Sequence, residues 1–186
     1  LWLRGGFPRS FLAATDAASF EWRRAFVATF LERDLPQLGV RTPSETLRRF
    51  WTMLAHYHGQ RWNGAELARS FGLSESSVRR YLDLLTDALV VRQLPAWHAN
   101  LGKRQVRAPK VFVEDSGLLH VLLGIADAAG LEGHPKVGAS WEGFEVQQVV
   151  DRLGAYPEEC FHWSTHAGAE LDLLVATTVI EVGVDV

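Results

Sequence analysis

The sequence predicts an α+β protein in which a helical first part is followed by short strands and further helices. Up to about residue 86, apolar residues recur three and four positions apart, as they do on one face of a helix. After that point, clusters of β-branched and aromatic residues indicate strands at 89–91, 111–113, 161–163, 170–176 and 179–184. Of the 186 residues 47% are hydrophobic, which excludes a disordered chain.

Two helices are expected in the first 60 residues. The first runs from about 17 to 35 and has an apolar stripe formed by Trp22, Phe26 and Phe30. The second follows Thr42 and ends at Gly59. Thr42 can cap this second helix, and Glu45 can reach back to the backbone N–H of the cap.

Residues 63–86 predict two short helices around a tight turn, which is the pattern of a helix-turn-helix. Gly72 permits a positive φ in the turn, and Ser74 can cap the second helix. The two strands that follow, joined by a basic segment, add the pattern of a winged helix. In such domains the second helix enters the major groove and the wing contacts the backbone. We therefore expect nucleic-acid contacts from Ser76, Ser77, Arg79, Arg80, Lys103, Arg104, Arg107 and Lys110.

Two other interpretations of this basic surface stay open. Winged helices also serve as protein-docking modules. Alternatively, Arg79 and Arg80 only solvate a helix face, and Asp83 and Asp87 on the same helix weaken their field.

The remaining elements follow from capping and glycine signals. Asp115 or Ser116 can cap a short apolar helix that stops at Gly124. Residues 124–139, rich in Gly and Ala, are expected to form a connector and the best domain boundary. Ser140 can then cap a helix that runs to about 153.

Three carboxylates in the last part of the chain suggest a divalent-cation site. Glu142 lies early in the last predicted helix, whereas Asp172 and Glu181 lie in predicted strands. Carboxylate oxygens are ligands that Mg²⁺ prefers, and a bound metal can activate water against a phosphodiester. This order resembles the PD-(D/E)xK nuclease fold, in which Asp172 and Glu181 would be metal ligands and Glu142 the helical carboxylate. The motif's lysine is missing, because Gly183 stands in its place. The alternative is that these are solvated helix and strand-edge carboxylates.

Several ordered stretches together resemble a large family of prokaryotic AAA-type P-loop ATPases with a C-terminal domain of unknown function. They are 1–8, 31–35, the helix-turn-helix, 112–123, 141–145 and 170–173. The resemblance implies an ATPase module that precedes Leu1, a winged helix, and a PD-(D/E)xK-like domain that continues beyond Val186. No G-x-x-x-x-G-K-[ST] loop occurs, and Gly102-Lys103 is followed by Arg104. ATP is thus expected only through the missing module.

The net charge of −3 conceals a strong asymmetry along the chain. Residues 1–110 carry 17 Lys and Arg against 9 Asp and Glu, whereas residues 111–186 carry 2 against 13. Such a division indicates two functional regions, of which the basic one can meet a polyanion. The alternative is that the two halves attract each other within one fold.

We therefore expect a helical segment over 1–60, a winged helix-turn-helix over 61–124 and a truncated PD-(D/E)xK-like α/β domain over 125–186. The expected function is a non-catalytic accessory region of an AAA-type ATPase that binds nucleic acid. Alternatives are a metal-dependent nuclease and a protein-docking module. One cysteine, Cys160, indicates a reducing compartment, hence the cytoplasm, and no apolar stretch is long enough to span a membrane. His56 and His58 are expected to be surface imidazoles.

Overall fold

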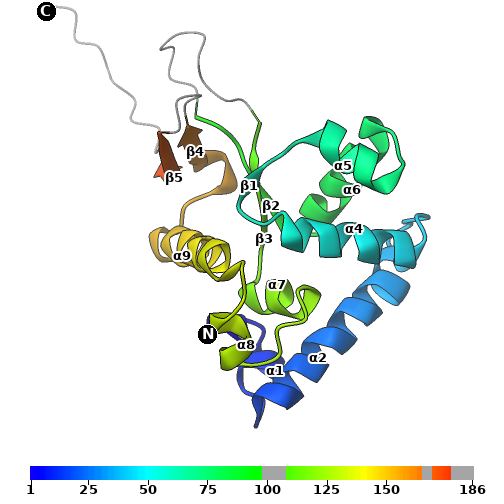
Figure 1. The fold of residues 1–186 in the computed structure, drawn as a ribbon, viewed down its shortest axis with the longest axis vertical. Coiled ribbons are helices and arrows are strands. Elements are labelled where there is room, and N and C mark those ends of the chain that lie inside the picture. The colour runs from blue at the N-terminus through cyan, green and yellow to red at the C-terminus, as the bar shows by residue number, and fades with distance from the viewer. Residues whose placement is uncertain (98–107, 165–168, 177–186) are drawn as a thin grey trace, which may run out of the picture.

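The structure, a computed structural model, describes residues 1–97, 108–164 and 169–176, and it has the α+β architecture that the sequence predicts. Helices lie below, to the right and to the left of a central three-stranded sheet in Figure 1, and a second, two-stranded sheet lies at the upper left. Within the described ranges, no helix combines the length and apolar character needed to cross a membrane.

The N-terminal part is a run of helical pieces: α1 (Pro8–Phe11), α2 (Asp16–Thr29), a π-helical turn (Phe30–Asp34) and α3 (Leu35–Gln37). Thr15 caps α2 by accepting a hydrogen bond from the Ala18 N–H at 3.1 Å. In the π-helical turn the Leu35 N–H donates to the Phe30 carbonyl, five residues earlier. The π-helical turn is compatible with Pro36, because proline has no backbone N–H to donate to the carbonyl four residues earlier. The helix predicted over 17–35 is confirmed, but its π-helical turn was not foreseen.

The next helix, α4 (Ser44–His56), packs its apolar stripe into the core as predicted; the buried residues include Leu47, Phe50, Trp51 and Leu54. The capping box predicted at its start is wrong. Pro43 occupies the cap position, and no side chain accepts a hydrogen bond from the first turn. Thr42 therefore lies one residue too early to reach those N–H groups.

Two helices and a tight turn follow, as predicted: α5 (Gly64–Phe71) and α6 (Glu75–Asp87). Gly72 has φ +66°, the left-handed conformation that closes α5. Ser74 caps α6, since its hydroxyl accepts a hydrogen bond from the Ser77 N–H at 3.2 Å. Four apolar side chains anchor α6 in the core: Val78, Tyr81, Leu82 and Leu85.

Three short antiparallel strands complete this part, in the order β1-β3-β2: β1 (Gln60–Arg61), β2 (Val91–Leu94) and β3 (Lys110–Val113). Strands are predicted from the alternation of apolar and polar residues, which cannot be detected over two residues. For this reason the sequence does not predict β1. The strand expected at 89–91 begins only at Val91, because Leu89 has a positive φ of 59° and turns the chain after α6. Lys110 opens the central strand, paired with Arg61 on one side and Leu94 on the other.

The apolar helix predicted after Asp115 is confirmed as α7 (Ser116–Leu122), with the Asp115 carboxylate accepting from the Leu118 N–H at 2.8 Å. The connector predicted at 124–139 is wrong as a structural assignment. This segment holds α8 (Ala128–Glu132) and the first turn of α9 (Val137–Leu153). Ser140 consequently lies buried inside α9 and does not cap it.

The C-terminal part is a hairpin preceded by a 3-10 turn (Pro157–Glu159): β4 (Cys160–Ser164) pairs antiparallel with β5 (Glu170–Val175). Ala96 forms a parallel bridge with His162, and the Trp97 N–H donates to the His162 carbonyl at 2.6 Å. The hairpin is thereby joined to the chain that leaves β2. The strand predicted at 179–184 lies outside the described residues.

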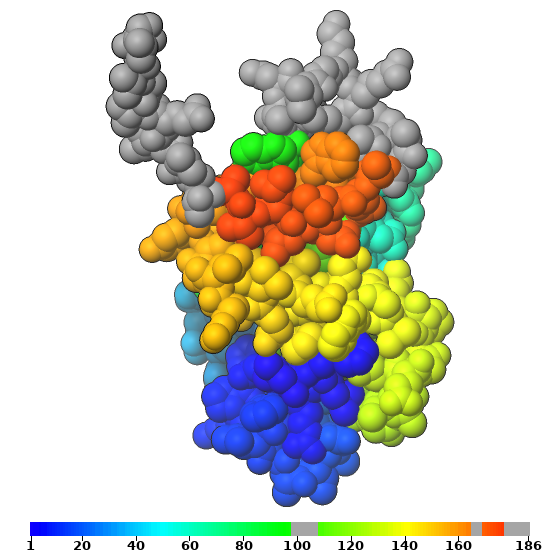
Figure 2. All heavy atoms as spheres, turned by 90° about the vertical axis from the view of Figure 1, so that its left-hand side faces the viewer, coloured from blue at the N-terminus to red at the C-terminus, as the bar shows by residue number. Residues whose placement is uncertain are grey.

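Two apolar clusters hold these parts together. The larger lies among α2, α4, α5, α6 and α7. The smaller joins the three-stranded sheet to α9 and the hairpin, through Leu94, Phe112, Val146, Val150 and Cys160. Figure 2 shows α9 lying across the molecule between β5 and the N-terminal residues.

Candidate nucleic-acid interface and acidic cluster

The first two turns of α6 present the polar residues that the sequence singled out. Ser76, Arg79 and Arg80 are exposed, and Ser77 is half-buried. The hydroxyls of Ser76 and Ser77 each lie 2.9 Å from that of Ser74, so the three serines form a hydrogen-bonded group at the start of the helix.

The two arginines of α6 differ in their surroundings. Arg79 is paired with Asp83, one turn along the helix, at 3.0 Å. Arg80 lies over the Tyr81 ring, 5.7 Å from its centre, and among the described residues it has no carboxylate partner. Arg80 is therefore the stronger candidate for an anion contact.

A hollow of about 610 Å³ lies beside α6 and brings a second arginine to the same place. It is formed by the loop from Gly39 to Pro43 together with Arg80, Tyr81 and Leu84. Arg41, on this loop, is exposed and has no ion-pair partner in the part of the chain that the structure describes. Two cationic side chains from separate elements thus flank one depression.

Of the four basic residues predicted in the segment between β2 and β3 and at the start of β3, the structure describes only Lys110. Lys103, Arg104 and Arg107 lie outside the described residues. Lys110, expected among the phosphate contacts, has a side chain only 3% exposed, and its ammonium points into a group of carboxylates. We do not include Lys110 in the interface.

The carboxylate group around Lys110 contains two of the three predicted metal ligands. The Lys110 Nζ lies 2.9 Å from Glu142 Oε1 on α9 and 2.8 Å from Asp172 Oδ1 on β5, and it also pairs with Glu170. Glu181 and Gly183 lie outside the described residues. The predicted convergence of Glu142 and Asp172 is observed, but around an ammonium group.

The charges of this cluster shift the pKa values of its members. Burial alone would lower the pKa of Lys110, but hydrogen bonds from its ammonium to Asp172, Glu170 and Glu142 outweigh burial and raise it. Burial raises the pKa of Glu142, and the negative charges of Asp172 and Glu170 add to that effect against the attraction of Lys110. The ammonium is thus held firmly charged among three carboxylates.

Sequence reasoning missed Lys110 and Glu170 as members of this cluster, although a signal existed for each. Glu170 and Asp172 are two residues apart in a strand, which places both on the same face. Lys110 opens a strand whose other members are apolar and buried, a setting in which a lysine requires partners.

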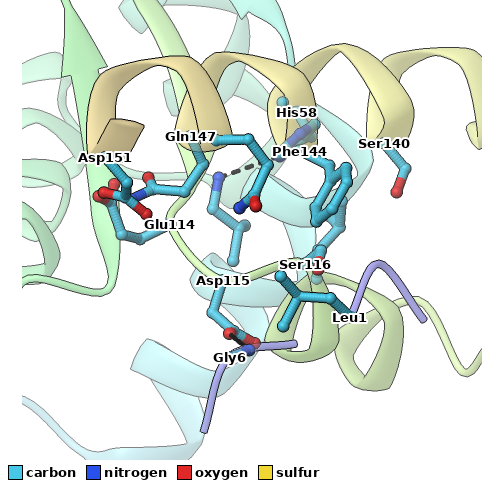
Figure 3. Close-up of a pocket in the computed structure, with 14 residues that line it drawn as sticks. Leu1, Gly6, His58, Glu114, Asp115, Ser116, Ser140, Phe144, Gln147 and Asp151 are labelled. Atoms are coloured by element: carbon cyan, nitrogen blue, oxygen red, sulfur yellow. Dashed lines mark hydrogen bonds between the residues drawn. The ribbon is translucent and has the colours of Figure 1, made fainter. Parts of the chain in front are cut away.

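A second cavity, of about 320 Å³, lies between α9 and the corner where β3 meets α7 (Figure 3). Its polar groups already serve the fold. Asp115 caps α7 and also accepts a hydrogen bond from the Gly6 N–H at 2.7 Å, and Gln147 donates to Asp151 at 2.7 Å. None of the residues predicted to bind nucleic acid or metal lines this cavity.

One wall of the cavity contains His58, for which the surface prediction is wrong, whereas His56 is exposed as expected. His58 is 2% exposed, and its Nδ1 accepts a hydrogen bond from the Val113 N–H at 3.0 Å. Burial lowers the pKa of His58 to about 3, so the ring is neutral.

The described residues contain no group of three or more His, Cys, Asp or Glu side chains arranged to hold a metal ion. The carboxylates around Lys110 are oriented toward its Nζ, which fills the position between them. The described part of the acidic cluster therefore does not fit the magnesium site that the nuclease resemblance implies.

Known proteins similar to the chain share its sequence over most of its length. Uncharacterized protein Rv2008c of Mycobacterium tuberculosis and Uncharacterized protein Mb2031c of Mycobacterium bovis are each 59% identical to it over 175 residues. The match covers 94% of this chain but only 39% of each relative. No solved structure matches the chain. A family model described as "Domain of unknown function (DUF8612)" matches residues 1–129, and the chain therefore belongs to the DUF8612 family.

Proposed function

We propose that the chain is a nucleic-acid-binding accessory region that contacts duplex DNA through the exposed start of α6. The observation that carries this proposal is the contrast between the two sides of α6. One side is anchored in the core, whereas the other presents Ser76 and Arg80 to solvent. Arg41 lines the same hollow as Arg80. A rigidly held helix with an exposed polar start is suited to enter a major groove.

The order of the elements supports a winged-helix interpretation. The chain runs α4, β1, α5, α6, β2 and β3, with β3 central in the sheet. In a winged helix the segment that joins the last two strands is the wing. Here that segment contains Lys103, Arg104 and Arg107.

We further propose that this region works within a longer AAA-type ATPase of the cytoplasm. The support is the sequence resemblance described above, together with the fact that the chain spans only 39% of the length of its mycobacterial relatives. ATP would be bound by the remainder of such a protein. The ATPase module is then the natural intramolecular partner.

Binding is tested by fluorescence anisotropy with a labelled DNA duplex, titrated at several salt concentrations. We expect the association constant to fall steeply with salt, because each phosphate contact releases condensed counterions. Arg80→Ala should weaken binding and reduce the slope of log K against log salt by about 0.9, the value of one lost phosphate contact. Absence of binding at low salt would overturn the proposal.

Two further variants make the test specific to α6. Asp83→Asn removes a negative charge and frees Arg79, so it should strengthen binding. Arg24→Ala is the matched control, since Arg24 is exposed and paired with Glu21 on α2, away from α6 (Figure 1). If Arg24→Ala weakened binding as much as Arg80→Ala, the interface would not be at α6.

A further inference from the structure

We propose that Lys110 is the resident cation of the acidic cluster: a side chain of the central strand β3 takes the place that a divalent metal takes in nucleases of the resembled fold. The cluster is then a metal-independent junction between the helix-turn-helix part and the C-terminal part of the chain.

The hydrogen-bonding capacities of the two sides match. A lysine ammonium has three N–H donors and no acceptor. Three carboxylates surround it, one each from Glu142, Glu170 and Asp172. The ammonium can therefore give one donor to each carboxylate.

The backbone of Lys110 is held in place as well as its ammonium group. Its backbone pairs with Arg61 of β1 and Leu94 of β2, so the residue is held at the start of the central strand. Its side chain is 3% exposed, whereas that of Asp172 is 54% exposed. A metal that entered between the carboxylates would have to displace the ammonium and leave a buried charge without partners, which is strongly unfavourable.

The arrangement of the carboxylate oxygens also differs from the coordination that a magnesium ion requires. Mg²⁺ needs near-octahedral oxygen coordination and retains several water molecules. In the described part of the chain the space between Glu142 and Asp172 is taken by Nζ at hydrogen-bonding distance from both. The lysine that the nuclease motif places after its second carboxylate is replaced by Gly183. Among the residues that the structure describes, the lysine at the cluster is Lys110, which comes from a different part of the fold.

The contacts of Lys110 join distant elements. Glu142 lies on α9 and Glu170 and Asp172 on β5, whereas Lys110 lies in the sheet that packs against α4 and α6. Part of the attraction between the basic and acidic halves of the sequence is thereby exerted at the buried Lys110 ammonium. Removal of Lys110 should loosen α9 and β5 from β3.

The test is a titration of the full chain with Mn²⁺, followed by electron paramagnetic resonance, together with thermal unfolding in Mg²⁺ and in EDTA. The unchanged protein should bind no Mn²⁺ at this cluster and should have the same Tm in both buffers. Lys110→Ala should have a lower Tm and should gain one Mn²⁺ site. That site should disappear when Asp172→Asn is added.

Two results would overturn the proposal. One is Mn²⁺ binding by the unchanged protein that Glu142→Gln abolishes, since Lys110 would then not occupy the cation position. The other is a folded Lys110→Ala variant, verified by circular dichroism, that binds no Mn²⁺, since the carboxylates would then form only an ion pair. If Lys110→Ala does not fold, Lys110→Ala with Glu170→Gln relieves the excess negative charge and is titrated in its place, with the same two outcomes.

Discussion

Buried histidines connect segments of this protein that lie far apart in sequence. His120 forms a chain of hydrogen bonds with Trp2, Ser140 and Leu3. The Trp2 Nε1–H donates to Ser140 Oγ at 3.0 Å, and the His120 Nε2 lies 2.7 Å from the same oxygen. The His120 Nδ1 lies 3.0 Å from the Leu3 carbonyl, to which it donates in the neutral tautomer. The first residues of the chain are thereby fixed against α7 and α9.

The pKa values of these histidines predict that stability falls in mild acid. Burial lowers the pKa of His58 to about 3 and that of His120 to about 4, against 6.5 for an ordinary histidine. Below pH 6.5 these histidines therefore bind protons in the unfolded chain but stay neutral in the folded chain. Their contribution to the free energy of unfolding is complete above pH 6.5 and is lost as the pH falls toward 4 and 3. Between pH 6.5 and 5 we expect a loss of about 1–2 kcal/mol per histidine in the free energy of unfolding.

Urea unfolding across this pH range measures the loss, and NMR titration of the histidine ring protons assigns it. In the folded protein the His58 resonances should not shift between pH 8 and pH 5, and those of His120 should shift only slightly near pH 5. In urea both should titrate near the ordinary value. A His58 midpoint above pH 6 in the folded protein would contradict the assignment.

At the scale of single elements, α9 is closely packed at one of its glycines and open at another. A Cβ at Gly143 would overlap Nε2 of the buried His58. By contrast, a Cβ at Gly138, in the first turn of the same helix, would meet nothing within 4 Å. The two glycines therefore have different reasons to be present.

This difference predicts opposite effects for the same substitution. Gly143→Ala should lower the free energy of unfolding by about 1–3 kcal/mol, because overpacking outweighs the gain in helix propensity. Gly138→Ala should raise it by about 0.5–1 kcal/mol, since only the helix propensity changes. Urea unfolding measures the free energy of unfolding of both variants. Equal changes in the two variants would show that His58 can move aside without a loss of stability.

Elements fixed by local signals were the ones that sequence could predict. α5, Gly72, Ser74 and α6 are set by turn and capping chemistry within about 25 residues, and all were predicted correctly. Ser140 was wrongly predicted to cap α9, because the partners that hold it inside the helix, Trp2 and His120, lie 20 or more residues away in the sequence. In the candidate interface, the pairing of Arg79 with Asp83 was within reach of the sequence, as a contact one helical turn apart. The identity of the partners of Lys110 was not, because two of the three lie 60 or more residues away.

At the scale of the whole molecule, the described parts form one packed unit across residues 124–139. Leu94 and Phe112 share an apolar cluster with Val146 and Val150 of α9. The bridge between Ala96 and His162 adds backbone contacts to this packing. The segments on either side of 124–139 thus bury each other's apolar surface.

We therefore expect the chain to unfold in a single cooperative transition. Differential scanning calorimetry should give equal calorimetric and van't Hoff enthalpies, which is the mark of two-state unfolding. A fragment that ends at Gly124 should expose Leu94 and Phe112 and bind the dye ANS, as expanded states with exposed apolar surface do. Two resolved transitions, with a fragment that does not bind the dye, would show instead that the two parts are independent domains.

The position of Lys110 also sets an order of events during synthesis. Its partner Asp172 lies 62 residues further along the chain. At ~5–20 residues per second, a ribosome needs about 3–12 s to add that length. During this interval α5 and α6 are already made, but the ammonium of the central strand still has to stay in water. The set of three carboxylates around Lys110 is therefore complete only after β5 has been made. A ribosome stalled before that point carries α5 and α6 beside a lysine that lacks two of its three partners.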